Sequence, residues 1–224
     1  MDVYCERVGA GLLAEPLNAI SNVSFLVAAW LAWVLARRTG TLSGRIKVLI
    51  LLGASVGIGS ILWHTVPNSV TFYLDVAPIL IFIMFYIWLF TRGVLGLGAG
   101  VAALSVAAFF VLTLLALSYS HVLHGALVYT PGLVVVLVFG LFHARQPTAA
   151  RFTLLAATGV YIAALFFRTI DNEVCPNLPI GTHFLWHLLI GLVTYLAVRA
   201  LVLSLGSRVQ QGAEFDRPRQ HHTA

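Results

Sequence analysis

The sequence predicts an all-α integral membrane protein, folded as a seven-transmembrane helix bundle. Of its 224 residues, 60% are hydrophobic and 9% are charged, whereas soluble domains carry about 25% charged residues. The mean hydropathy is +0.95, and the apolar residues form long continuous runs. A membrane β-barrel would instead show short segments in which apolar and polar residues alternate. The net charge of +5 does not indicate nucleic-acid binding, because the basic residues are spread over loops and a tail.

Seven apolar segments build the bundle, each close to the ~20 residues that a helix needs to cross a bilayer. We expect spans at about 17–36, 46–64, 72–91, 95–117, 125–143, 152–169 and 182–204. A polar stretch at 118–121 joins the fourth and fifth, so six spans with one long hairpin is the alternative count. Residues 1–206 then form one domain, and residues 207–224 are predicted to be a polar, disordered cytoplasmic tail.

The charged residues are distributed unequally between the two ends of the predicted bundle. With seven spans, one face holds most basic residues: Arg37, Arg38, Arg45, Lys47, Arg92, Arg145, Arg151, Arg208, Arg217 and Arg219. Acidic residues fall on or near the other face: Asp2, Glu6, Glu15, Asp75, Asp171 and Glu173. Because basic loops favour the cytoplasm, we expect the N-terminus outside and the C-terminus inside. The arginine-rich inner loops and compact size suit a bacterial inner membrane, which is the location that we expect.

Both cysteines fall on the predicted outer face. Cys5 precedes the first span, and Cys175 lies in the loop before the seventh. An oxidising exterior would permit a disulfide that ties the two ends of the bundle together. Two free thiols are the alternative, because a disulfide also requires a geometry that the sequence does not supply.

The seventh segment begins with two histidines four residues apart, His183 and His187. Residues at this spacing lie on the same face of a helix and suit two ligands of one metal ion. The topology places three further polar side chains at the same depth, namely Ser60, His64 and Asp75. Three neutral imidazoles with a fourth position open to water form a catalytic zinc site. The alternative is that each histidine only bridges two helices.

These five polar residues on three segments resemble a motif of the CREST superfamily of seven-helix membrane hydrolases. Similarity to the alkaline ceramidases and their bacterial relatives extends to three N-terminal stretches, namely Tyr4-Cys5-Glu6, Ala14-Glu15-Pro16-Leu17-Asn18 and Ser21-Asn22. The resemblance covers the chain from Cys5 to the seventh segment. Progestin and adiponectin receptors share the core, but the Cys-Glu run and Cys175 favour the ceramidase branch, and we expect a bacterial ceramidase-like member.

The resemblance implies a zinc-dependent hydrolase that cleaves the amide bond of ceramide or a related N-acyl lipid to a fatty acid and an amine. It implies that Zn2+ is held by His64, His183 and His187. Asp75 would act as general base and return the proton to the leaving amine. Ser60 would stabilise the oxyanion, an interaction typically worth a few kcal/mol. The expected partners are the lipid substrate and the bilayer, without nucleic acid or an obligate protein partner.

Ceramidases are also similar in carrying a calcium ion near the N-terminus. The resemblance places the Tyr4 carbonyl, Glu6 and Glu15 at ligand positions, whereas Val3 and Val8 stand where the family has polar residues. Ca2+ favours six to eight oxygen ligands, so this set is small. The alternative is that the two glutamates cap helices or pair with a neighbouring arginine.

Two other functions are compatible with seven helices. A receptor or sensor of the progestin and adiponectin receptor type would bind lipid around a mainly structural zinc, usually with a signalling domain that we do not expect here. A transporter would place polar residues along the full depth of the bundle, whereas here they cluster at one face. For a hydrolase, the scissile bond is left open between a sphingolipid amide, another N-acyl amide and an ester.

Overall fold

The computed structural model describes residues 4–9, 11–146 and 150–215, with side chains up to residue 207. Seven of its helical stretches are long and apolar enough to cross a membrane, when α1 is counted with α2 and η1 with α6. The elements are α1 (Pro16–Ser21), α2 (Val23–Arg38), α3 (Gly44–Thr65), α4 (Ser69–Gly93), α5 (Ala99–Leu117), η1 (Val122–Tyr129), α6 (Thr130–Ala144), α7 (Thr153–Val174) and α8 (His183–Phe215). The predicted all-α, seven-span membrane protein is confirmed, and the six-span count is wrong.

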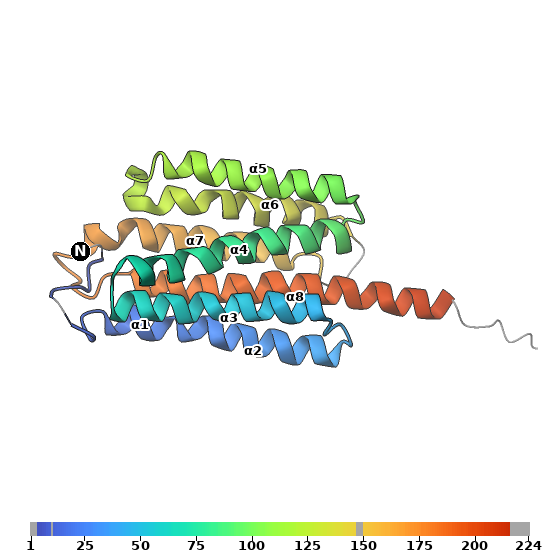
Figure 1. The fold of residues 1–224 in the computed structure, drawn as a ribbon, viewed down its shortest axis with the longest axis horizontal. Helices are drawn as coiled ribbons and strands as arrows, with labels where there is room; N and C mark the ends of the chain where they lie inside the picture. The colour runs from blue at the N-terminus through green and yellow to red at the C-terminus, as the bar shows by residue number, and fades with distance from the viewer. Residues whose placement is uncertain (1–3, 10, 147–149, 216–224) are drawn as a thin grey trace, which may run out of the picture.

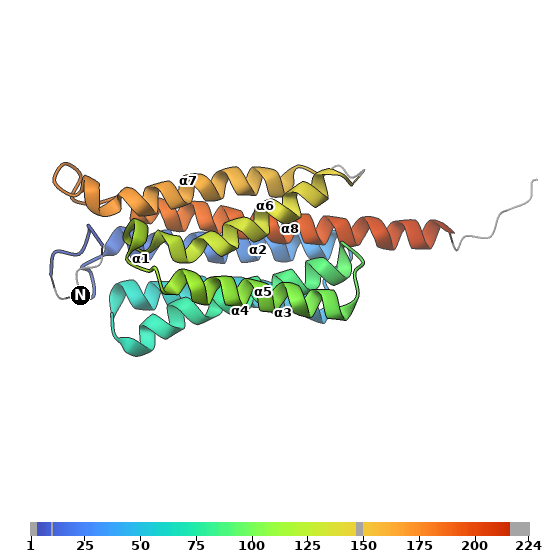
Figure 2. The same cartoon turned by 90° about the horizontal axis from the view of Figure 1, so that it is seen from above.

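The seven spans form a closed ring. Each span packs against the next from α2 to α8, and α8 closes the ring by packing against α2 (Figures 1 and 2). Because the number of spans is odd, the N-terminus lies at one end of the bundle, and α8 runs out past the other end (Figure 1). The ring surrounds a central cavity, which is lined by residues of α2, α3, α4, α6, α7 and α8.

The two halves of the bundle differ in what they bury. In the half far from the N-terminus, most of the core is apolar and includes the fully buried Leu49, Phe90 and Leu201. In the half near the N-terminus, many buried side chains are polar: Glu15, Asn18, Ser21, Asn22, Ser60, His64, Asp171, His183 and His187. Buried polar groups are costly unless they find partners, so this end is where a functional site is expected.

The fifth span begins differently from its prediction. The span reaches back to Val122, but its first part is the 3-10 element η1, and regular α-helix starts at Thr130 instead of residue 125. The cause is a left-handed backbone at Leu123, His124 and Gly125, with φ angles of 53°, 50° and 83°. Two of these residues are not glycine, and periodicity of apolar residues does not reveal such a turn.

The last two helices are longer than predicted. Helix α7 continues past residue 169 to Val174, and this extension carries Asp171 into the helix. Helix α8 continues past residue 206, where we placed the end of the domain, to Phe215. Residues 216–224, which include the basic residues Arg217 and Arg219 of the predicted tail, lie outside the described residues, as do Asp2 and Val3.

Helices α3 and α4 approach each other closely at Gly59. A Cβ atom there would lie 1.9 Å from the carbonyl oxygen of Leu74 and 3.1 Å from the amide nitrogen of Asp75. The Leu74 carbonyl has no helical hydrogen bond to accept, because the residue four positions later is Pro78, which has no N–H. The glycine contact therefore places Asp75 next to the end of α3 that carries Ser60.

We expect Gly59→Ala to destabilise the protein far more than Gly53→Ala does. At Gly59 the added methyl group collides with backbone, so the two helices must separate, whereas at Gly53 the nearest atom is Thr194 Cγ2 at 3.5 Å, an ordinary contact. Overpacking of this kind costs about 1–3 kcal/mol or more. The apparent melting temperature in detergent should fall by several degrees for Gly59→Ala and change little for Gly53→Ala. Equal values for the two variants would contradict the close approach.

Candidate metal centre

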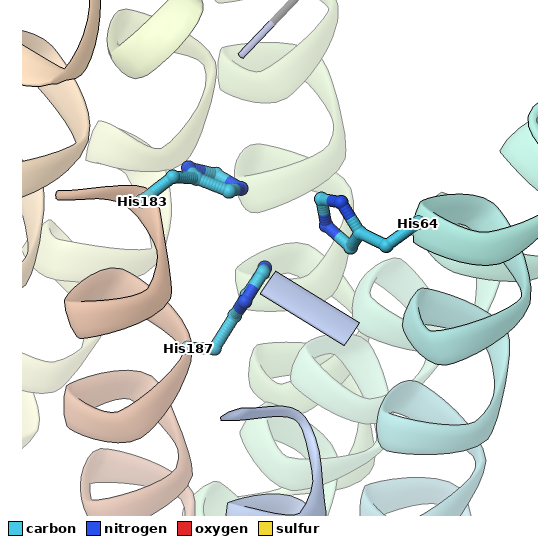
Figure 3. A group of neighbouring side chains, drawn as sticks. All are labelled: His64, His183 and His187. Atoms are coloured by element: carbon cyan, nitrogen blue, oxygen red, sulfur yellow. The ribbon is translucent and has the colours of Figure 1, made fainter. Parts of the chain in front are cut away.

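Three buried imidazoles meet at the N-terminal end of the bundle. His64 comes from the last turn of α3, and His183 and His187 come from the first two turns of α8. They are 1%, 2% and 3% exposed. Their rings face one another across the gap between the two helices (Figure 3), and one potential ligand atom from each lies within 4.8 Å of the others. The structure thus brings together the three histidines that the sequence predicts as metal ligands.

The Nδ1 atoms of His64 and His187 are engaged by α1 and its flanking residues. Glu15 bonds to Nδ1 of His64 through a carboxylate oxygen. At His187, the Ser21 hydroxyl lies 2.9 Å from Nδ1 and the Asn22 amide nitrogen 3.3 Å from it. Glu15 and the Ser21 hydroxyl can each accept a hydrogen bond from Nδ1, which leaves Nε2 of each ring for a metal. A metal-ligating histidine usually has such a partner on its other ring nitrogen, so His64 and His187 fit a metal ion.

Glu15 links His64 to a buried arginine. Its other carboxylate oxygen accepts a hydrogen bond from Nε of Arg7, and Nη2 of Arg7 donates to the backbone carbonyl of His64 over 3.1 Å. Burial opposes the charged form of Glu15, but hydrogen bonds from His64, Arg7 and Asn18 outweigh it and lower the pKa of the carboxyl. Glu15 is therefore a carboxylate that orients a histidine of the centre.

The residues near the N-terminus do not fit a calcium ion. Both carboxylate oxygens of Glu6 accept backbone N–H groups at the start of α1, from Leu17 at 2.7 Å and Asn18 at 2.9 Å. Glu15 is in contact with the Arg7 guanidinium, which is a cation already. The Tyr4 carbonyl accepts the Arg7 N–H at 3.2 Å. The two glutamates are thus used as in the alternative interpretation: Glu6 caps a helix, and Glu15 forms an ion pair.

Ser60 and Asp75 lie beside the histidines. Both line the central cavity together with His183 and His187. Ser60 is one turn before His64 and is 3% exposed, and it interacts with the Asp75 carboxylate. The five polar residues predicted to share one depth therefore do so.

Asp171 and Tyr4 support His183 in ways that the sequence does not reveal. The Asp171 carboxylate accepts the backbone N–H groups of Thr182 at 2.7 Å and His183 at 2.9 Å, so it caps the start of α8. It also accepts the N–H of Cys5 at 3.1 Å. The Tyr4 ring stacks on the His183 ring with centroids 3.9 Å apart, and burial raises the pKa of Tyr4 to about 12. The periodicity of apolar residues does not reveal a capping residue that lies twelve positions before its helix.

A disulfide joins Cys5 and Cys175, whereas the sequence left both a disulfide and two free thiols open. It fastens the N-terminal segment to the end of α7. That segment carries Tyr4 and Arg7, both of which contact histidines of the centre. The disulfide therefore holds in place the N-terminal segment that contacts the histidines.

Away from the histidines the central cavity is apolar. Toward the middle of the bundle its walls are formed by Phe25, Val56, Phe82, Val193 and Ala197. A mostly apolar cavity with a few polar groups at one end is the usual form of a small-molecule binding site.

Comparison with known proteins supports this description. Residues 4–219, nearly the whole chain, match a family model described as Ceramidase. A comparison with curated proteins finds no match.

Proposed function

This chain belongs to the ceramidase family, and we propose that it is a zinc-dependent intramembrane hydrolase of ceramide or a related N-acyl lipid. Family membership makes it a lipid amide hydrolase, and seven apolar helices make it a multi-pass membrane protein. The observation that carries the proposal is the cluster of His64, His183 and His187 next to Ser60 and Asp75, at the head of an apolar cavity.

Three imidazoles suit zinc in a catalytic site, where three protein ligands leave a fourth position for water or substrate. Glu15 and Ser21 hold two of the rings so that Nε2 of His64 and His187 would bind the metal. Zinc bound there supplies Lewis-acid chemistry, by polarising a carbonyl group and making a water molecule more acidic.

Asp75 transfers protons, and Ser60 stabilises the oxyanion. Asp75 takes a proton from the attacking water at a carboxylate oxygen and delivers it to the amide nitrogen as the C–N bond breaks. The Ser60 hydroxyl donates a hydrogen bond to the carbonyl oxygen as negative charge develops on it. Both side chains line the cavity beside His183 and His187, which supports this division.

The substrate enters from the membrane with its acyl chain in the apolar part of the cavity. We place the metal centre at the extracytoplasmic face, because basic residues such as Arg37 and Arg38 lie at the opposite end of the bundle, in the last turn of α2. The bacterial inner membrane stays our prediction for the location.

Metal content and fatty-acid release test this proposal together. The purified wild type should contain about one zinc per chain, as expected for a three-histidine site, and should release fatty acid from labelled ceramide or another N-acyl lipid. A chelator should stop the release, and added zinc should restore it. A folded, active and metal-free wild type would refute the proposal. A zinc-loaded protein that is inert on lipid amides and esters would favour a receptor or sensor.

A further inference from the structure

Arg168 is a cation in the wall of the central cavity. It extends from α7, and its guanidinium lies over three aromatic rings, 4.8 Å from the centroid of Tyr129, 5.6 Å from Trp186 and 5.9 Å from Tyr4. Its Nη1 lies 3.3 Å from Nδ1 of His183. The ion pairs within the described residues do not include Arg168. The Tyr4 hydroxyl and the Asp75 carboxylate also act on the guanidinium, but among the described residues no carboxylate is in direct contact with it.

The guanidinium also has an unused hydrogen-bond donor. Its Nε atom is buried and has no hydrogen-bond partner among the described residues. A buried charge is costly unless it is paired and hydrogen-bonded, and cation–π contacts offset only part of that cost. An arginine in this state, in a cavity that admits a substrate, is suited to bind an anionic oxygen of that substrate.

Asp75 lines the same cavity and carries the opposite charge. The proposed reaction places the leaving amine at Asp75, since this carboxylate delivers a proton to the nitrogen. A leaving group that suits both side chains has an ammonium group for Asp75 and, close to it, an anionic group for Arg168. Amino acids have this arrangement, with one carbon atom between the two charges.

We propose that Arg168 binds a carboxylate on the amine half of the substrate, and that N-acyl amino acids are therefore substrates of this protein. The inference rests on the proposed function, because it specifies the lipid that the same site hydrolyses. In the reaction, water forms a new C–O bond to the acyl carbon and the C–N bond breaks. Both protons of the water end on the nitrogen, so the products are a fatty-acid carboxylate and a zwitterionic amino acid.

A matched pair of substrates tests the role of Arg168. N-oleoylglycine and N-oleoylethanolamine share the acyl chain and the amide, but one ends in a carboxylate and the other in a hydroxymethyl group. A charge-assisted hydrogen bond should raise kcat/KM for the glycine conjugate about tenfold or more over the ethanolamide in the wild type. In Arg168→Gln the ratio should fall to about one or below, since the charge is lost. A ratio near one in the wild type, or one that Arg168→Gln leaves unchanged, would overturn the inference.

The ratio separates substrate recognition from structural support. Arg168 contacts His183, so its loss can weaken the metal centre, but such damage slows both substrates together and leaves their ratio unchanged. Arg199→Gln is the matched control. It removes another guanidinium of the bundle, whose Nη1 donates to the Thr153 hydroxyl at 2.9 Å and which does not line the cavity. The preference for the glycine conjugate should persist in this variant.

Stabilisation of the protein by bound lipids tests the inference independently of hydrolysis. N-oleoylglycine should raise the melting temperature of the wild type more than N-oleoylethanolamine does, and this difference should vanish in Arg168→Gln. Oleate is the third ligand, because the guanidinium could instead hold the carboxylate of the released fatty acid. If oleate stabilises the wild type as much as N-oleoylglycine does, the assignment to the amine half is wrong. Absence of all lipid amide hydrolysis would refute the proposed function, and the binding differences would still support or overturn the role of Arg168.

Discussion

His64→Ala should remove both the bound metal and the lipid amide hydrolysis. The substitution takes away the ligand that α3 contributes, and the two histidines of α8 alone leave a metal ion bound to a single helix. Metal chemistry supplies several kcal/mol of transition-state stabilisation, so the rate of fatty-acid release should drop by on the order of a thousandfold or more. Elemental analysis of the purified variant and release of labelled fatty acid measure the two effects.

His143→Ala is the matched control for this substitution. His143 is also a fully buried histidine, but it lies on α6 in the apolar half of the bundle, where Nε2 bonds to the Ser204 hydroxyl over 2.9 Å. Each folded molecule of this variant should keep its zinc. A His64→Ala protein that retains the metal content of the wild type would show that α3 does not contribute a ligand.

The cluster of three histidines could be predicted because it depends on two regularities of the chain. Helical spacing puts His183 and His187 on one face. Four spans lie between α3 and α8, so the last turn of α3 and the first turn of α8 are at the same end of the bundle. The order of the spans therefore predicts which residues lie at the same depth in the membrane. Ser60 follows from His64 by one helical turn, and Asp75 follows because it begins the next span.

The partners of the histidines could not be predicted, because they depend on how helices are rotated and how a short segment folds over them. Glu15 and Ser21 were visible as part of a family resemblance, yet nothing in their spacing indicates that they bond to imidazoles. Arg168 lines the central cavity, and nothing in the sequence indicates that its side chain does so. Side-chain direction, unlike depth, is decided by tertiary packing.

The two predicted ion sites differ in how far a sequence can indicate their ligands. A zinc site needs three or four strong ligands, and helical spacing supplies two of them together. A calcium site needs many oxygens from an irregular loop, and the periodic spacing of residues does not predict the conformation of such a loop. In this chain Arg7 pairs with Glu15, and Glu6 is used to cap α1.

Asp75→Asn should keep the metal and abolish most of the lipid amide hydrolysis. Asparagine has nearly the same shape as aspartate, so the contact between α3 and α4 at Gly59 should persist, but the amide cannot accept a proton. General acid–base catalysis typically contributes 10²–10⁴-fold, and we expect the rate of fatty-acid release to fall by about this factor, with zinc content unchanged. Glu173→Gln, which changes an exposed carboxylate near the same end of the bundle, is the control and should keep its activity.

The leaving group then separates the two proton transfers assigned to Asp75. An amide nitrogen must be protonated before it departs, whereas p-nitrophenolate departs from an ester without a proton. If Asp75 serves both steps, Asp75→Asn should slow hydrolysis of the lipid amide more than that of a p-nitrophenyl ester with the same acyl chain. Equal losses would limit Asp75 to activating the attacking water, because only that step is common to both substrates. An unchanged amide rate would contradict both roles, and the base would have to be sought among the other polar groups of the cavity.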